Sequence, residues 1–222
     1  MSSPQRGASF RDLTVGAFVD ALSSAEPVPG GGSASAVAAS LGAALVSMVA
    51  SLSEGRPKYA EHAELHAASI ATARRLASRF LDLADEDASA YGAYALAMKL
   101  PRDTDDEKAF RRKAMSAAAR GAADVPLATV VACLELVAVA ESLVGRSNPN
   151  AASDLDVAAL LAEAAARGAA ANVLINLPSV DDEAYVEEAT DRVMRLLDSI
   201  EELAATAHAQ VRSGGSRDSI PA

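Results

Sequence analysis

Asp87 is the residue whose type and position most strongly suggest chemistry. At helical spacing it shares one face with Phe80, Ala84, Tyr91 and Met98, so a carboxylate interrupts an apolar stripe. Burying a carboxylate is costly unless it is paired or hydrogen-bonded. Such a group is therefore either held in a structural pair or used as a functional charge or base. The spacing alone leaves both interpretations open.

A second apolar stripe carries polar groups at both ends. Asp154, Leu161, Gly168 and Asn172 share one helical face, and Asn176 lies one turn further on. This pattern is consistent with a binding site at either end of the helix. It is equally consistent with a local cap at Asp154 and buried hydrogen bonds from Asn172 to neighbouring helices.

The segment Pro27-Val28-Pro29-Gly30-Gly31-Gly32-Ser33 joins a glycine-rich loop to a helix that has no charged residue before Glu54. Glycines let a backbone approach a ligand closely, and a helix N-terminus offers free N–H groups to anions. We expect Ser33 to be the N-cap of this helix. The segment is neither a Walker A motif nor a GxGxxG motif after a strand, so a tight turn is the competing interpretation.

Cations flank the predicted turns at Arg56, Lys58, Lys99 and Arg102, and a local positive patch or solvated helix ends would both explain them.

The pair His62 and His66 has the i, i+4 spacing of metal ligands but no evident third ligand. We therefore expect no metal site.

The pattern of apolar residues predicts an all-α fold, a single-domain helical bundle of about six helices with no strand. A kink is expected at Pro126, because proline removes a backbone hydrogen bond. We expect an N-terminal segment over 1–12, one helical domain over 13–212 and a disordered tail over 213–222. The predicted helices are 13–23, 33–52, 60–98, 105–145, 153–176 and 182–211.

The helix over 33–52 is apolar on all sides. In the chain as a whole, half the residues are hydrophobic but only 4% are aromatic, so small apolar residues predominate. Its many alanines and serines make it weakly hydrophobic for a lipid-facing span, so burial among other helices is the better interpretation. One small bundle offers it little cover. We therefore expect it at the interface of a homodimer, with a monomer as the alternative.

The formal net charge is −10, which disfavours nucleic acid and anionic membrane as partners, because both require basic patches. Cys133 is the one cysteine, so the chain has no internal disulfide and no cysteine-based zinc site. The N-terminus lacks the layout of a signal peptide. Together these features predict a cytoplasmic protein.

Four segments, taken in order, resemble the cyclodeaminase/cyclohydrolase family, which comprises the cyclodeaminase domain of formiminotransferase-cyclodeaminase and stand-alone methenyltetrahydrofolate cyclohydrolases. Each segment alone is a weak signal, and the resemblance extends from about Leu13 to Val211. Pro57 departs from the family pattern, which more often has lysine there. The segments are Pro29–Ala34, Gly55–Tyr59, Asp85–Tyr91 continuing to Lys99-Leu100-Pro101, and Asn148–Asp154 with Gly168, Asn172, Ile175 and Asn176.

The resemblance implies a homodimeric helical fold, a tetrahydrofolate one-carbon substrate, and neither a metal nor a nucleotide cofactor. No segment resembles a formiminotransferase domain, which favours hydrolysis of 5,10-methenyltetrahydrofolate to 10-formyltetrahydrofolate. Two alternatives stay open: a formiminotetrahydrofolate cyclodeaminase, which releases ammonia and forms methenyltetrahydrofolate, and a non-catalytic folate-binding dimer.

The resemblance also suggests roles for individual residues. Asp87 is the first candidate for the catalytic carboxylate, and Asp154 is the second. The backbone over Gly30, Gly31, Gly32 and Ser33 is expected to line the pterin or one-carbon pocket. The remaining candidates are amides for the pterin edge and cations for the glutamate carboxylates of the substrate: Asn148, Asn150, Arg56, Lys58 and Lys99.

Overall fold

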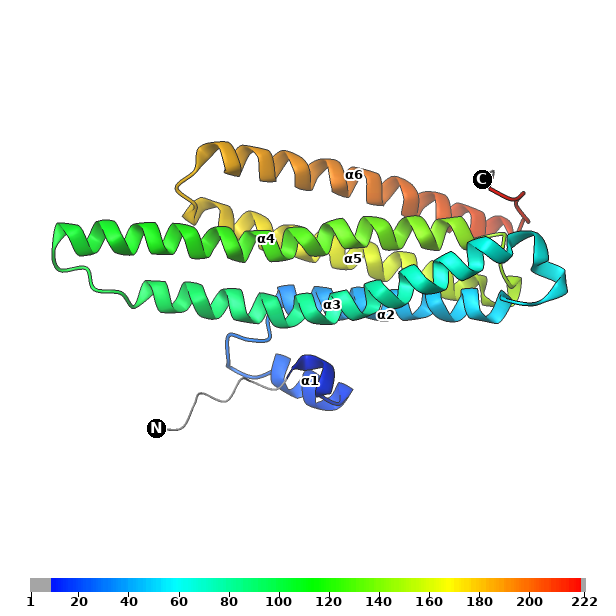
Figure 1. Ribbon diagram of the computed structural model, residues 1–222, viewed down its shortest axis with the longest axis horizontal. Helices are drawn as coiled ribbons and strands as arrows, with labels where there is room; N and C mark the ends of the chain where they lie inside the picture. The colour runs from blue at the N-terminus through cyan, green and yellow to red at the C-terminus, as the bar shows by residue number, and fades with distance from the viewer. Residues whose placement is uncertain (1–8, 221–222) are drawn as a thin grey trace.

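A computed structural model describes residues 9–220, and within them every regular element is helical (Figure 1). This confirms the predicted all-α bundle. The long helices are α2 (Gly31–Ser53), α3 (Ala63–Met98), α4 (Asp105–Leu143), α5 (Ala152–Asn176) and α6 (Glu183–Ser213). The short elements are η1 (Phe10–Asp12), α1 (Val15–Leu22), η2 (Pro57–His62), η3 (Pro149–Ala151) and η4 (Leu177–Ser179).

Helices α2 to α5 form the bundle, and α6 lies against α4 and α5 (Figure 1). The helix α2 packs mainly between α3 and α5, which explains why it carries no charge. Beyond the N-terminus of α2, the α3–α4 hairpin extends further along the long axis of the molecule (Figure 1).

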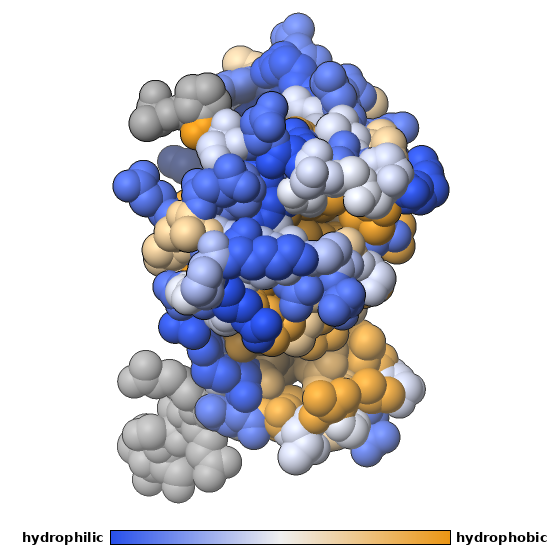
Figure 2. Space-filling model, turned by 90° about the vertical axis from the view of Figure 1, so that its right-hand side faces the viewer, coloured by the Kyte–Doolittle hydropathy of each residue, from blue (hydrophilic) through white to orange (hydrophobic). Residues whose placement is uncertain are grey.

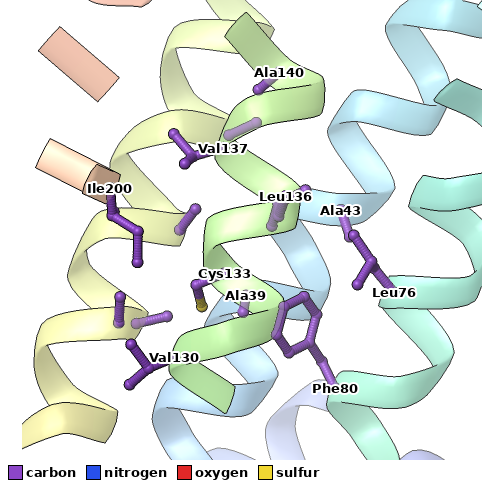
Figure 3. Close-up of a cluster of buried hydrophobic side chains, with 14 of the residues drawn as sticks. Ala39, Ala43, Leu76, Phe80, Val130, Cys133, Leu136, Val137, Ala140 and Ile200 are labelled. Atoms are coloured by element: carbon purple, nitrogen blue, oxygen red, sulfur yellow. The ribbon is translucent and has the colours of Figure 1, made fainter. Parts of the chain in front are cut away.

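Small side chains allow these helices to approach closely. Ala39 and Ala43 of α2 face Leu76 and Phe80 of α3 in the interior (Figure 3), and all four are buried. A Cβ atom at Gly42 would lie 3.1 Å from the Ala158 carbonyl oxygen of α5, so this crossing is tight. The alanine-rich composition is therefore the means by which α2 contacts two neighbours along its length.

Two helix starts differ from the predictions. The helix α2 begins at Gly31 with Gly30 as its N-cap, so Ser33 is not the N-cap but lies in the first turn. Its hydroxyl is engaged with α3 instead. The short helix η3 leads directly into α5, which begins at Ala152 with Ala151 as its N-cap, one residue before the predicted start at 153. The helix α4 runs from Asp105 to Leu143 with Pro126 inside it, which agrees with the predicted helix over 105–145.

The segment that follows α6 contacts the end of α4. The disordered tail expected over 213–222 stays a prediction, and its residues 221–222 lie outside the described residues. Gly214 ends α6 with φ of 66°, in the left-handed region that favours glycine. The backbone N–H of Arg217 then donates to the Gly145 carbonyl at 3.0 Å, and its guanidinium donates to Glu141 at 2.7 Å. These contacts hold the segment against the end of α4.

Three helical segments are long and apolar enough to cross a membrane, judged by length and composition alone. They are Gly31–Ser53, Asp105–Leu143 and Pro149–Ser179. Within the bundle, between 44% and 50% of the most apolar stretch of each is buried against other helices. Packing among helices therefore accounts for much of their apolar character.

Apolar side chains also remain on the surface. In Figure 2 they gather in the lower part of the molecule, where Figure 1 places α1. Val15 of α1 is 81% exposed, and α1 has no buried residue. The exposed leucine and methionine residues of α2 lie at helical spacing on one stripe, formed by Leu41, Met48 and Leu52.

Candidate active site

The N-terminus of α2 meets the middle of α3 at Asp87. The Ser33 hydroxyl lies 3.0 Å from Asp87 Oδ2 and 3.0 Å from the Ala84 carbonyl oxygen. Ser33 is fully buried, whereas Asp87 is half-buried and Gly31 is exposed. The carboxylate is therefore fixed from the protein side and open toward solvent at the first turn of α2.

Glycine at position 32 is required by this arrangement. A Cβ atom there would lie 2.2 Å from Asp87 Oδ1 and 2.6 Å from its Cγ, far inside van der Waals contact. At Gly31 the nearest atom to an added Cβ is Asn172 Nδ2 at 3.5 Å, which is an ordinary contact. The glycine run thus lets Asp87 lie directly against the helix backbone.

Helix α5 forms the third side of the site through Asn172. The Asn172 amide nitrogen donates to the Gly168 carbonyl at 2.8 Å. Asn176 continues the line: its Nδ2 donates to the Asn172 carbonyl at 2.8 Å and to the Ala122 carbonyl of α4 at 2.9 Å. These bonds fix the polar end of α5 beside the first turn of α2.

Burial raises the pKa of the Asp87 carboxyl above its ordinary value. Hydrogen bonds from the hydroxyl and the backbone N–H of Ser33 partly offset that effect. A raised pKa makes the carboxylate a stronger base. Because a hydroxyl can both donate and accept, Ser33 can bond to Asp87 in either protonation state, with the Ala84 carbonyl taking the hydroxyl proton when Asp87 is protonated.

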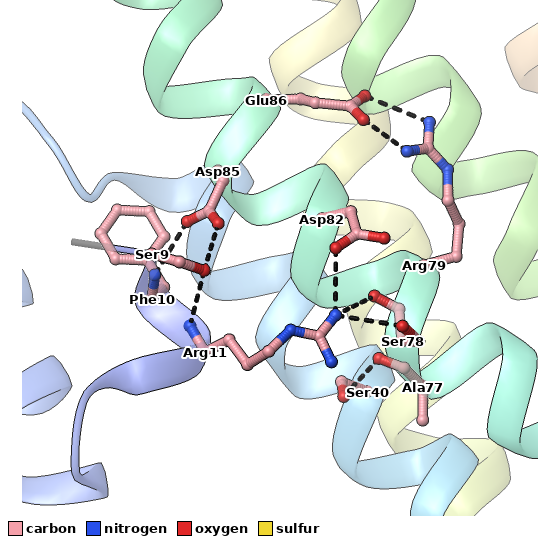
Figure 4. A network of polar contacts seen from close by, with 10 residues as sticks. All are labelled: Ser9, Phe10, Arg11, Ser40, Ala77, Ser78, Arg79, Asp82, Asp85 and Glu86. Atoms are coloured by element: carbon pink, nitrogen blue, oxygen red, sulfur yellow. Dashed lines mark hydrogen bonds and ion pairs between the residues drawn. The ribbon is translucent and has the colours of Figure 1, made fainter. Parts of the chain in front are cut away.

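The acidic residues that precede Asp87 have structural partners (Figure 4). Asp82 pairs with Arg11 at 3.0 Å, and Glu86 forms a bidentate pair with Arg79. Asp85 accepts hydrogen bonds from the Ser9 hydroxyl at 2.5 Å and the Phe10 backbone N–H at 2.9 Å. Asp82 and Glu86 thus pair with arginines, and Asp85 is bonded to the segment before α1. Within residues 9–220, Asp87 has neither kind of partner. This difference favours the functional interpretation of its place on an apolar stripe.

The other predicted catalytic carboxylate, Asp154, lies at the opposite end of the bundle. It stands in the first turn of α5, and 18 residues separate it from Asn172 on the same helix, a distance of about 27 Å at 1.5 Å per residue. Within one chain, Asp154 and Asp87 therefore belong to different sites.

The structure also separates the predicted substrate-binding residues into two groups. Asn148 lies at the C-terminal end of α2, where its backbone N–H donates to Ser53 Oγ at 2.8 Å. Its side chain caps η3 by accepting from the Asn150 N–H at 3.1 Å. Arg56 and Lys58 are exposed in and just before η2 at that same end. Gly30 to Ser33 lie with Asp87, and the exposed Lys99 caps the C-terminus of α3 beyond it.

His66 has a structural role. Its Nε2 lies 2.9 Å from the Arg146 carbonyl oxygen, and its ring packs edge-on against His62. No group of three or more His, Cys, Asp or Glu side chains is arranged to hold a metal among residues 9–220.

The geometry defines an open acid–base site at a helix N-terminus in an all-helical bundle, and three comparisons place the chain in a family. The family model described as Formiminotransferase-cyclodeaminase matches residues 14–195. The chain belongs to that family. In solved structures it resembles the crystal structure of formiminotetrahydrofolate cyclodeaminase from Thermotoga maritima, with a TM-score of 0.83 and 25% identity over 91% of this chain and 98% of that one.

Two curated relatives differ in how much of their length the chain matches. It is 40% identical over 185 residues to the methenyltetrahydrofolate cyclohydrolase of Methylorubrum extorquens, covering 83% of this chain and 88% of that protein. It is 36% identical over 184 residues to the formimidoyltransferase-cyclodeaminase of Gallus gallus, but spans only 34% of that protein.

Proposed function

We propose that this protein hydrolyses 5,10-methenyltetrahydrofolate to 10-formyltetrahydrofolate. The observation that carries the proposal is Asp87, a half-buried carboxylate with a raised pKa and no cationic partner among the described residues. The similarity to the Methylorubrum extorquens cyclohydrolase supports this reaction, because the match covers most of both proteins.

The methenyl carbon is part of a cationic amidinium, so it is already electrophilic. In the proposed mechanism Asp87 lies beside this cation, stabilises its charge and accepts a proton from the attacking water. A tetrahedral carbinolamine forms. As the bond from carbon to N5 breaks, N5 takes the proton held by Asp87. The hydroxyl proton then leaves as the formyl C=O forms on N10. One water is consumed and one proton released.

Water is the only co-substrate in this scheme. We propose that no metal or nucleotide cofactor takes part, since the positive charge of the amidinium supplies the activation that a Lewis acid would otherwise provide. The Ser33 hydroxyl keeps Asp87 in position through both proton transfers.

The test is an absorbance assay for loss of the methenyl chromophore, with the uncatalysed hydrolysis subtracted. Asp87→Asn should lower kcat by roughly 100-fold to 10,000-fold, the usual contribution of a general base. Asp85→Asn is the matched control, because it removes the same charge two residues away, its amide oxygen can still accept from the Phe10 N–H, and its NH2 group can donate to the Ser9 hydroxyl. Full turnover in a folded Asp87→Asn protein would remove Asp87 from the mechanism.

The same assay separates the alternative reaction. Formiminotetrahydrofolate offered to the wild-type protein would generate methenyl absorbance if the chain were a cyclodeaminase like its Thermotoga maritima relative. A rise with that substrate and no loss with methenyltetrahydrofolate would overturn the hydrolase proposal. No change with either substrate would favour a folate-binding protein.

We further propose that the protein is a cytoplasmic homodimer whose interface includes α2. Leu41, Met48 and Leu52 present an apolar stripe on that central helix, and Leu41 is 56% exposed in the single chain. Burying such a stripe against a second copy would remove it from water. The free, buried thiol of Cys133 suits a reducing compartment.

A further inference from the structure

The side-chain amide of Asn172 has a free hydrogen-bonding edge beside the candidate active site. Its Nδ2 donates to the Gly168 carbonyl at 2.8 Å, and because a carbonyl oxygen only accepts, this bond also fixes which end of the amide carries the oxygen. Asn172 Oδ1 accepts no hydrogen bond from residues 9–220. In the same range, His208 Nε2 is the only buried side-chain nitrogen or oxygen without a partner. Asn172 Oδ1 is therefore open to solvent and to a ligand.

Asn172 and Asp87 approach consecutive residues in the first turn of α2. A Cβ atom at Gly31 would lie 3.5 Å from Asn172 Nδ2, and one at Gly32 would lie 2.2 Å from Asp87 Oδ1. Consecutive Cα atoms are about 3.8 Å apart, so Nδ2 and Oδ1 are at most about 13 Å from each other. A fused bicyclic ring can contact both groups at once across this distance.

Exposed apolar side chains border the two polar groups. Ile175 follows Asn172 by three residues on α5, and 76% of it is exposed. Tyr91 follows Asp87 by four residues on α3, and 42% of it is exposed. Residues three and four apart are neighbours on a helix surface, so each polar group has apolar surface next to it. This combination suits a planar ring that has a polar edge.

The tetrahydropterin ring of the proposed substrate has such an edge, a lactam in which N3–H lies next to the C4 carbonyl. A primary amide is complementary to a lactam, because its oxygen accepts from the N–H and its NH2 group donates to the carbonyl. Asparagine makes the same kind of two-bond contact with adenine in DNA. Asn172 has both groups available, since Oδ1 is free and Nδ2 carries a second hydrogen besides the one donated to Gly168.

We propose that Asn172 binds the lactam edge of the tetrahydropterin ring while the methenyl carbon lies at Asp87. The inference rests on the proposed function and extends it from the reacting carbon to the ring that carries it. The C4 carbonyl and N5 lie on the same side of the ring system. A lactam held by Asn172 therefore leaves the one-carbon unit on N5 between α5 and Asp87.

This assignment moves the expected pterin-binding amide. Asn148 and Asn150, predicted from the sequence for that role, lie at the C-terminal end of α2, where the Asn148 side chain caps η3. That end of the 23-residue helix is about 33 Å from the end that meets Asp87. Within one chain, a ring whose methenyl carbon is at Asp87 can reach Asn172 but neither of the other two amides.

The test uses two substrates with the same amidinium, methenyltetrahydrofolate and an analogue built on tetrahydroquinoxaline, in which a benzene ring replaces the pyrimidinone and no lactam remains. Asn172→Ser removes the free amide edge, but its hydroxyl can keep the bond to the Gly168 carbonyl, as Ser35 does with the Gly31 carbonyl at 2.8 Å. Asn176→Ser is the matched control. It makes the same change one turn further on, where Nδ2 donates to two backbone carbonyls.

Asn172→Ser should raise the KM of methenyltetrahydrofolate roughly tenfold to fiftyfold, as expected from the loss of two neutral hydrogen bonds, with kcat within about threefold of wild type. The KM of the analogue should change by less than about twofold, because it has no lactam to lose. Asn176→Ser should change both KM values by the same small factor. An unchanged KM for methenyltetrahydrofolate in Asn172→Ser, or an equal rise for both substrates, would overturn the proposal. Thermal unfolding checks that both variants are folded.

A binding measurement separates this proposal from the proposed reaction. Tetrahydrofolate carries the lactam but no one-carbon unit, so its binding requires no turnover. In titration calorimetry its Kd should rise roughly tenfold to fiftyfold in Asn172→Ser and less than about twofold in Asn176→Ser. This result would support the lactam contact even if no substrate were hydrolysed. An unchanged Kd together with an unchanged KM in Asn172→Ser would refute the contact while leaving the hydrolase activity intact.

Discussion

The close contact between Gly32 and Asp87 allows a specific prediction about the kcat of a Gly32→Ala variant. Replacing Gly32 by alanine places a Cβ atom 2.2 Å from Oδ1, 2.6 Å from Cγ and 2.7 Å from Oδ2 of Asp87. Because all three atoms of the carboxyl group are too close, rotation of the group alone does not relieve the clash. Ordinary contact begins near 3.4 Å, so Oδ1 must retreat by about 1.2 Å.

A retreat of this size should disable the base without unfolding the protein. Misplacing a catalytic group by about 1 Å can cost 100-fold in rate, so we expect Gly32→Ala to lower kcat by about 100-fold. Stability should change little, since alanine is a better helix former than glycine by about 0.5–1 kcal/mol in a helix interior. The half-buried Asp87 side chain can also move away as a whole by turning about its Cα–Cβ bond. The assay is steady-state hydrolysis of methenyltetrahydrofolate combined with thermal unfolding.

Gly31→Ala is the matched control for this experiment. It makes the same chemical change one residue earlier in the same first turn, where an added Cβ comes only within 3.5 Å of Asn172 Nδ2. We expect its kcat to stay within about threefold of wild type. If both variants lose activity equally, the glycines act through the substrate rather than through Asp87. If Gly32→Ala retains wild-type kcat, Asp87 is not the base in the position described.

Three further predictions follow from the same contacts and from the apolar stripe of α2. Ser33→Ala removes a hydrogen bond that lowers the pKa of Asp87, so the acidic limb of the pH profile of kcat should move to higher pH; an unmoved limb would contradict this. Asp87→Asn should be more stable than wild type at neutral pH. Since folding raises the Asp87 pKa, ionisation disfavours the folded state, and the gain should vanish below pH of about 3.9; guanidinium unfolding at several pH values measures it. Leu41→Glu should convert the proposed dimer to monomers in analytical ultracentrifugation, whereas Leu96→Glu, at a residue 68% exposed on α3, should not.

Periodicity was sufficient to predict the five long helices, α2 to α6, because each of them buries one face along its length. The predicted starts of α2 and α5 were wrong, because a single contact can decide at which residue a helix begins. The N-cap of α2 lies at Gly30 because the Ser33 hydroxyl bonds to Asp87 and Ala84 across the interface, a partner that local sequence cannot reveal. The course of the segment after α6 depends on a contact of the same kind, since the Arg217 guanidinium donates to Glu141 on α4.

The site was only half predictable from the sequence. Asp87 stood out because a carboxylate on an apolar stripe is anomalous, and that signal needs only the helical period. Asp154 gave the same kind of signal, but no pattern in the sequence says which ends of two helices meet. The antiparallel course of α2 and α5 brings Asn172, not Asp154, beside the glycines. Arg102 was predicted only as a cation beside a turn, and its grouping with Arg112 of α4 around one hollow depends on how the α3–α4 hairpin packs.

The composition of α2 and the chemistry of Asp87 have one physical cause. A carboxylate that must act as a base needs a raised pKa, and here burial provides it. Burial of a charge next to a helix requires that the helix present no side chain at the contact, which Gly32 satisfies, and that one polar group remain to hold the carboxylate, which Ser33 supplies. Small residues along the rest of α2 let α3 and α5 converge on that first turn. A bulkier core would separate the helices, and Asp87 would then lie in water with an ordinary pKa and little power as a base.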